Sequence, residues 1–176
     1  MDLEHLSQIT VRDAEGADLL ALVAIKGAGS EALHRDRLRE AQGSGFRYLV
    51  LLAGERLVAF GCLVIRRPAT WSDGSDPLHL PCIIDLQVKE TCRNQGFGSE
   101  LIRHMERIAV EMGFEHLYIA VEPGNNPRAY ALYQRLGYRS LQTKPYLKVW
   151  EFTDSGGRLH HGEDWLVDMV KTLEIK

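Results

Sequence analysis

The stretch from Cys82 to Met112 constrains the fold most, because its apolar pattern changes once along its length. Residues 82–88 are an almost continuous apolar run, which is typical of a buried β-strand. From Gly98 onward the apolar side chains instead recur with the 3.6-residue period of one helix face; they are Leu101, Ile102, Met105, Ile108, Ala109 and Met112. A buried strand that leads into an amphipathic helix is characteristic of proteins in which helices pack on a sheet.

The segments on both sides extend this pattern into one α/β domain over residues 1–176. The sequence predicts further strands at 9–11, 48–52, 57–65, 117–121, 146–152 and 165–170, and further helices up to Gly27, at 30–42 and at 126–136. Residues 66–79, rich in Pro, Gly, Ser and Asp, are expected to form a loop. We therefore expect a mixed sheet of six to seven strands with helices on both faces.

Charge and cysteine usage exclude several classes of protein. The formal net charge is -3 and the basic residues are interspersed with acidic ones, so neither nucleic acid nor an acidic membrane is expected as a partner. Cys62, Cys82 and Cys92 have no Cys-x-x-Cys spacing, which argues against a disulfide framework and a zinc site, and no metal is expected. The acidic N-terminus and the absence of a run of ~20 apolar residues favour a cytoplasmic protein.

The turn between the central strand and helix has the features of an anion site. It reads Arg93-Asn94-Gln95-Gly96-Phe97-Gly98-Ser99, and its two glycines leave room for a phosphate at the helix N-terminus. Arg93 adds a cation with a forked donor. A Walker A loop would need Gly-Lys-Ser/Thr, and a dinucleotide fingerprint would need a small residue where Leu101 stands. The glycine pair alone could equally be a tight turn without a ligand.

A second segment makes the pattern specific. It reads Asn126-Pro127-Arg128-Ala129-Tyr130-Ala131-Leu132-Tyr133-Gln134-Arg135-Leu136-Gly137-Tyr138. With the turn at 93–99 and the opening Ile9–Ala14, this segment resembles the GCN5-related N-acetyltransferase (GNAT) superfamily. The resemblance implies a GNAT-like acyl-CoA N-acyltransferase fold and an enzyme that moves an acetyl group from acetyl-CoA to the primary amine of a small molecule or peptide.

The resemblance also assigns coenzyme-binding residues. The pyrophosphate should lie on the turn, and the pantetheine arm should pair with the end of the central strand, where that strand splays from the strand at 117–121. Asn126 should contact the arm, although a helix cap would explain this residue as well. The residues so assigned are Leu86, Gln87, Val88, Arg93, Asn94, Gln95, Gly96, Phe97, Gly98, Ser99 and Asn126.

Two residues are candidates for the chemistry. Tyr133 is predicted to protonate the departing thiolate, unless it is a core tyrosine on a helix face. Asp85, a carboxylate in an otherwise apolar strand, is predicted to be the base, because such a group is costly to bury unless it is paired or functional. A structural hydrogen bond would also explain Asp85. Glu122, His79 or a chain of water molecules are the alternatives for the base.

The acceptor is less constrained by the sequence. Trp71, Asp73 and Asp76 in the loop predict an acidic mouth that attracts a cationic amine. The arginines of the second helix, Arg35, Arg37 and Arg39, could instead recruit an amine that bears a carboxylate. Rival interpretations are a non-catalytic acyl-CoA-binding sensor and, more distantly, a nucleotide-binding enzyme. A homodimer is also open.

Overall fold

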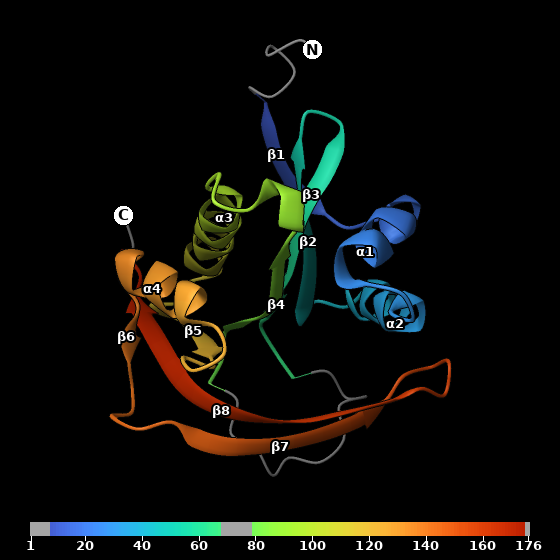
Figure 1. Cartoon of the computed structure of the whole chain (residues 1–176). Coiled ribbons are helices and arrows are strands. Elements are labelled where there is room, and N and C mark those ends of the chain that lie inside the picture. Colours follow the sequence, from blue (N-terminus) through green and yellow to red (C-terminus); the bar gives the residue numbers. More distant parts are fainter. Residues whose placement is uncertain (1–7, 68–78, 175–176) are drawn as a thin grey trace.

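Residues 8–67 and 79–174, the part of the chain that the computed structural model describes, form eight strands, four α-helices and two short 3₁₀-helices (Figure 1). In chain order they are β1 (Ile9–Asp13), η2 (Gly16–Asp18), α1 (Leu19–Lys26), α2 (Glu31–Glu40), β2 (Phe46–Ala53), β3 (Arg56–Val64), β4 (Cys82–Val88), η3 (Glu90–Cys92), α3 (Phe97–Glu111), β5 (His116–Val121), α4 (Pro127–Arg135), β6 (Arg139–Ser140), β7 (Tyr146–Thr153) and β8 (Leu159–Thr172).

The strands form one mixed sheet in the order β1-β2-β3-β4-β5-β8-β6, and β7 pairs with β8. β4 and β5 are parallel, and the other neighbours are antiparallel. The long helix α3 connects the two parallel strands, as a parallel pair requires a crossover. The expected mixed sheet is therefore confirmed.

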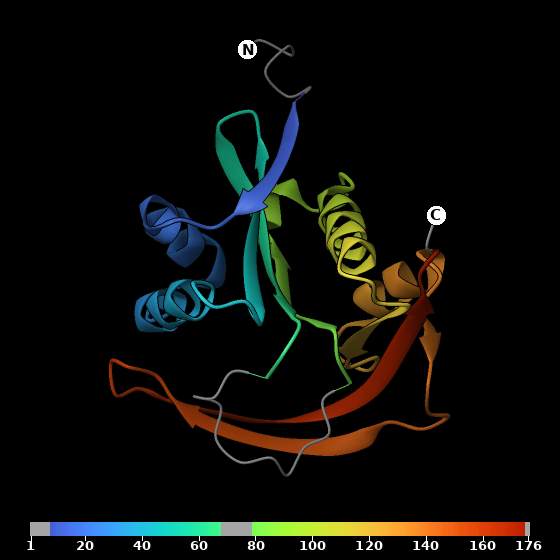
Figure 2. The same cartoon turned by 180° about the vertical axis from the view of Figure 1, so that it is seen from behind.

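Helices cover both faces of the sheet. α1 and α2 lie on one face, and α3 and α4 lie on the other (Figures 1 and 2). Alternate residues of β2 serve the two layers: Tyr48 and Val50 pack in a cluster with Leu22 of α1, whereas Leu49 and Leu51 pack in a cluster with Leu101 of α3. A strand buried on both faces needs apolar residues at successive positions, which explains the unbroken run in the sequence.

The closing hairpin differs from the expectation in length. The sequence predicted a strand at 165–170, but β8 spans 14 residues. Its second part pairs with β5 in the main sheet, and its first part pairs with β7 in a ribbon that curves below the sheet (Figure 1). Exposed and partly buried residues alternate along that first part and none of them is fully buried, so it lacks the continuous apolar signal of a core strand. The two-residue strand β6 was also not predicted.

One expectation lies outside the described residues. The acidic mouth of Trp71, Asp73 and Asp76 lies in residues 68–78, which the structure does not describe.

The longest helix, α3, has 15 residues, and no helix in the described ranges is long and apolar enough to cross a membrane.

Candidate functional site

The turn before α3 exposes backbone amides. Gly96 and Asn94 have φ angles of 85° and 62°, in the left-handed region that Gly and Asn tolerate best. The first hydrogen bond of the helix runs from Glu100 N to Gly96 O at 3.0 Å, and no side chain caps this end. The amides of residues 97–99 therefore have no acceptor within the helix, as the predicted anion site requires.

The glycines keep this end of the helix open. A Cβ added at Gly96 would have no atom within 4 Å, and one at Gly98 would lie 3.5 Å from Val88 Cγ2. The side chains around them turn to other partners: Arg93 Nε donates to Val88 O at 3.3 Å, and the Phe97 ring is buried in the core. The predicted anion site is thus formed mainly by backbone.

The central strand separates from its parallel neighbour beside this turn. β4 pairs with β5 only through Cys82–Tyr118 and Ile83–Ile119. Beyond Ile83 no strand in the described residues pairs with this edge of β4, while its other edge still pairs with β3 as far as Val88. The splay expected between these strands is present, and the edge at 86–88 can accept an extended ligand as an additional strand.

A bulge shapes β4 at the start of this free edge. Asp85 has a φ of 49°, and the register between β3 and β4 shifts between Phe60 and Cys62. Gly61 lies opposite the bulge, where an added Cβ would come within 2.9 Å of Leu86 Cδ1. A glycine at position 61 therefore allows the bulged strand to approach, and its occurrence in an apolar strand was the available signal for the bulge.

Asp85 is held in a cluster of ions. Its carboxylate accepts hydrogen bonds from Lys26 Nζ of α1 at 3.0 and 3.1 Å, from Arg37 Nη1 of α2, and from Gln87 Nε2 at 2.9 Å. Burial alone raises the pKa of Asp85, but the charges of Arg37 and Lys26 outweigh it, and the pKa is lowered. A carboxylate with a lowered pKa is a weak base. These contacts favour the alternative that Asp85 is structural, tying β4 to α1 and α2.

Tyr133 lies on α4 next to the turn. Its neighbour Leu132 reaches within 3.9 Å of a Cβ placed on Gly98, and the ring centroid of Tyr133 is 6.2 Å from that of Tyr138. The side chain is 7% exposed, and burial raises the pKa of Tyr133 to about 12. The phenol therefore remains protonated at neutral pH, as a proton donor must be.

Asn126 caps α4, since its Oδ1 accepts a hydrogen bond from Ala129 N at 3.2 Å. The cap is therefore present as the sequence indicated. A contact between Asn126 and the coenzyme arm stays a prediction.

The two alternative bases have different surroundings. Both carboxylate oxygens of Glu122 already accept hydrogen bonds, from Asn125 Nδ2 at 2.8 Å and from Trp165 N at 3.2 Å. The His79 ring stacks on Tyr118 of β5 with centroids 5.0 Å apart, and its Nε2 lies 3.9 Å from Asp168 Oδ2 on β8. His79 is thus close to the apex of the splay. The sequence did not predict that Lys26 contacts Asp85 or that Asp168 lies near His79. Contacts between residues so far apart in the sequence leave no local pattern.

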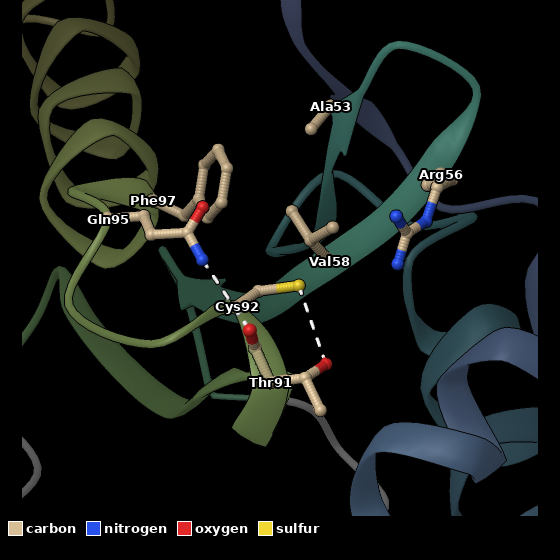
Figure 3. Close-up of a pocket in the computed structure, with 7 residues that line it drawn as sticks. All are labelled: Ala53, Arg56, Val58, Thr91, Cys92, Gln95 and Phe97. Atoms are coloured by element: carbon tan, nitrogen blue, oxygen red, sulfur yellow. Dashed lines mark hydrogen bonds between the residues drawn. The ribbon is translucent and has the colours of Figure 1, made fainter. Parts of the chain in front are cut away.

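A cavity of about 260 Å³ lies behind the turn (Figure 3). Gln95 and Phe97 line one wall and Arg56 lies across from them. Gln95 Nε2 donates to Thr91 O at 3.5 Å, which closes the turn on this side. The free edge of β4 at 86–88 is not among its lining residues, so the cavity is separate from the splay. Within the described ranges no group of three His, Cys, Asp or Glu side chains could hold a metal ion.

Comparisons with known proteins agree with this geometry. Residues 16–138 match the Acetyltransferase (GNAT) family. The structure is similar to that of the ribosomal-protein-S18-alanine N-acetyltransferase from Escherichia coli, with a TM-score of 0.64 and 19% identity over 96% of both chains. A GNAT superfamily phosphinothricin acetyltransferase from Sinorhizobium meliloti in complex with AcCoA gives a TM-score of 0.64 and 20% identity, over 94% of this chain and 88% of that one.

A third similar structure is an N-acetyltransferase from Staphylococcus aureus Mu50, with a TM-score of 0.64 and 18% identity, over 97% of this chain and 100% of that one. A search of curated protein sequences gives no match. At these identities the solved structures establish the fold.

Proposed function

The chain belongs to the GNAT acetyltransferase family, and from this premise we propose that it transfers an acetyl group from acetyl-CoA to the primary amine of a small molecule or peptide. The observation that carries the proposal is the free edge of β4 at 86–88, which leads through η3 into the open turn at 93–99. Together they offer a strand edge that pairs with no described strand to an extended arm, and helix amides without an acceptor in the helix to a pyrophosphate.

The residues fit the coenzyme. The amides of Gln95 to Ser99 would bind the pyrophosphate, with Asn94 and Gly96 setting the left-handed turn and Arg93 adding charge. The free edge at 86–88 would pair with the pantetheine arm. Bound there, acetyl-CoA supplies the thioester from which the acetyl group is transferred.

The chain's own groups would then orient the reactants and move two protons. Holding the amine and the thioester together can remove ~7–11 kcal/mol of the barrier. A backbone N–H near Val88 would polarise the carbonyl. The Tyr133 hydroxyl, protonated because burial raises its pKa to about 12, would donate a proton to the thiolate.

For the base we propose His79 ahead of Asp85 and Glu122. Histidine is the side chain that most often serves as a general base, whereas the ion pairs of Asp85 lower its pKa and each Glu122 oxygen already accepts a hydrogen bond. His79 stacks on Tyr118, which pairs with Cys82 just before β4 and β5 separate, so an amine that enters the splay would approach the imidazole. The His79→Gln variant tests this assignment. If its rate of acetyl transfer equals that of the native chain, a chain of water molecules removes the proton instead.

The test combines binding with turnover. The full chain is heated with and without acetyl-CoA, and thiol release is followed with a panel of amino acids, polyamines and short peptides. We expect a rise in Tm with acetyl-CoA and thiol release with at least one amine. A rise in Tm without turnover for any amine supports the non-catalytic sensor instead. No rise in Tm contradicts the proposal at its first step.

A further inference from the structure

The ion cluster of Lys26, Arg37 and Asp85 contains two cations and one carboxylate. All three side chains are largely buried, with exposed fractions of 22%, 14% and 17%. The neighbouring groups add no charge at neutral pH, since burial keeps the pKa of His34 at about 4 and that of Cys62 at about 12. Among the ion pairs of the described residues, Asp85 is the carboxylate partner of both Lys26 and Arg37. The cluster therefore holds one positive charge that no described residue neutralises.

An uncompensated charge in such a place is costly. Partly buried ions are tolerated when they are paired and hydrogen-bonded, and the penalty grows as water is excluded. Here the single carboxylate of Asp85 is the shared ion-pair partner of Lys26 and Arg37. An incoming anion would complete the cluster, and the fork of Arg37 is well shaped for a carboxylate.

The other basic residues of α2 do not share this property. Arg35 pairs with Glu31 and Arg39 pairs with Asp36, and their side chains are 58% and 63% exposed. Of the three arginines that the sequence indicated for a carboxylate, Arg37 is the one directed at β4.

The cluster lies beside the proposed acetyl site. Asp85 directly precedes the free edge at 86–88, and a strand advances only ~3.3 Å per residue. α1 and α2 supply the cations from the face of the sheet opposite to α3 and α4 (Figures 1 and 2). An amine that approached the free edge from the α1–α2 face would have a second group within reach of Lys26 and Arg37.

We propose that the acceptor is an amine that bears a carboxylate close to its amino group, in the manner of an α-amino acid, and that Lys26 and Arg37 bind this carboxylate. This inference rests on the proposed function, and it names the substrate class of the same site. It differs from the expectation of a cationic acceptor, which rested chiefly on Trp71, Asp73 and Asp76 outside the described residues and stays a prediction.

The test uses pairs of amines that differ by one carboxylate, such as leucine with isoamylamine and phenylalanine with phenethylamine. KM and kcat are measured for the native chain and for Lys26→Met, Lys26→Arg and Arg37→Gln. Arg35→Gln, on the exposed side of α2, is the matched control. We expect the native chain to prefer the carboxylate member of each pair. We expect Lys26→Met and Arg37→Gln to raise its KM about 10-fold or more, as for loss of a hydrogen bond to a charged group.

The other variants distinguish whether Lys26 and Arg37 bind the acceptor or only stabilise the fold. Lys26→Arg should restore the KM, Arg35→Gln should leave it unchanged, and the KM for acetyl-CoA should not move in any variant. A preference for the amine without a carboxylate overturns the inference, as does an equal rise in KM for both members of a pair.

Failure of the proposed function is distinguished by binding. If no amine is turned over, the Tm of the native chain and of Lys26→Met is measured with each amino acid. A rise in Tm for the native chain alone still supports the carboxylate site. No rise for either protein overturns it.

Discussion

Tyr133 can be tested as a proton donor because its packing and its hydroxyl are separable. The Tyr133→Phe variant keeps the buried ring beside Tyr138 and removes only the oxygen. We expect kcat to fall about 10²–10⁴-fold, the usual contribution of general acid catalysis, with no change in acetyl-CoA affinity. Tyr130→Phe on the same helix is the control, since the Tyr130 hydroxyl bonds Ser140 Oγ at 3.1 Å. An unchanged single-turnover rate in Tyr133→Phe would reduce Tyr133 to a core residue.

His34 should make stability depend on pH in a defined range. It is fully buried, and it shares a hydrogen bond of 2.6 Å with the Tyr48 hydroxyl. Burial, followed by the charges of Arg37 and Lys26, lowers the pKa of His34 from 6.5 to about 4. Between these values the unfolded chain binds the proton and the folded chain does not. The stabilisation is therefore complete above pH 6.5 and is lost as the pH falls toward 4.

The measurement is urea unfolding at several pH values. The native chain should lose on the order of 2–3 kcal/mol between pH 6.5 and 4 through this residue. The His34→Gln variant should show a flatter dependence over the same range, whatever its absolute stability. His116→Gln, at an exposed position, should keep the native slope. Equal slopes in all three proteins would contradict the prediction.

At the scale of elements, α3 offers a matched test of the turn, because it has a left-handed glycine at each end. Gly96 and Gly113 both have a φ of 85°, and a Cβ added at either would have no atom within 4 Å, so valine would strain the backbone similarly at both. Gly96→Val should lose the rise in Tm with acetyl-CoA, since its side chain occupies the anion site. Gly113→Val should be destabilised comparably but should keep that rise. If neither variant shows a rise in Tm with acetyl-CoA, backbone strain and not a blocked anion site explains the loss of binding.

The elements also show what a sequence reveals by itself. The period of α3 and the apolar runs of β2 and β3 follow from burial of one face or of two, so they were predictable. The ribbon part of β8 is exposed and has no such pattern. Likewise the turn at 93–99 is a local motif, whereas Lys26 and Asp85 are 59 positions apart and meet only through the packing of α1 on β4. Local chemistry could be predicted, and contacts between layers could not.

For the whole molecule, the two apolar clusters share their strands. β2 and β3 contribute to the cluster under α1 and to the cluster under α3. Neither helical layer can therefore keep its packing surface if the sheet is lost. β8 joins the ribbon to the same sheet, because it pairs with both β7 and β5. From this continuity we infer that the described residues fold as one unit, and a single domain over residues 1–176 stays a prediction.

We therefore expect one cooperative unfolding transition. Calorimetry should give a single peak, with an enthalpy on the order of 120 kcal/mol near ~60 °C for a chain of this length, and with equal calorimetric and van't Hoff values. Far-UV circular dichroism, which reports the whole sheet, should follow the same curve as the fluorescence of Trp150 and Trp165, which lie on the ribbon. Acetyl-CoA should move the entire peak, because a ligand that binds only the folded chain stabilises everything that folds with its site. Two peaks, or fluorescence that changes before circular dichroism, would show that the ribbon or one helical layer unfolds independently.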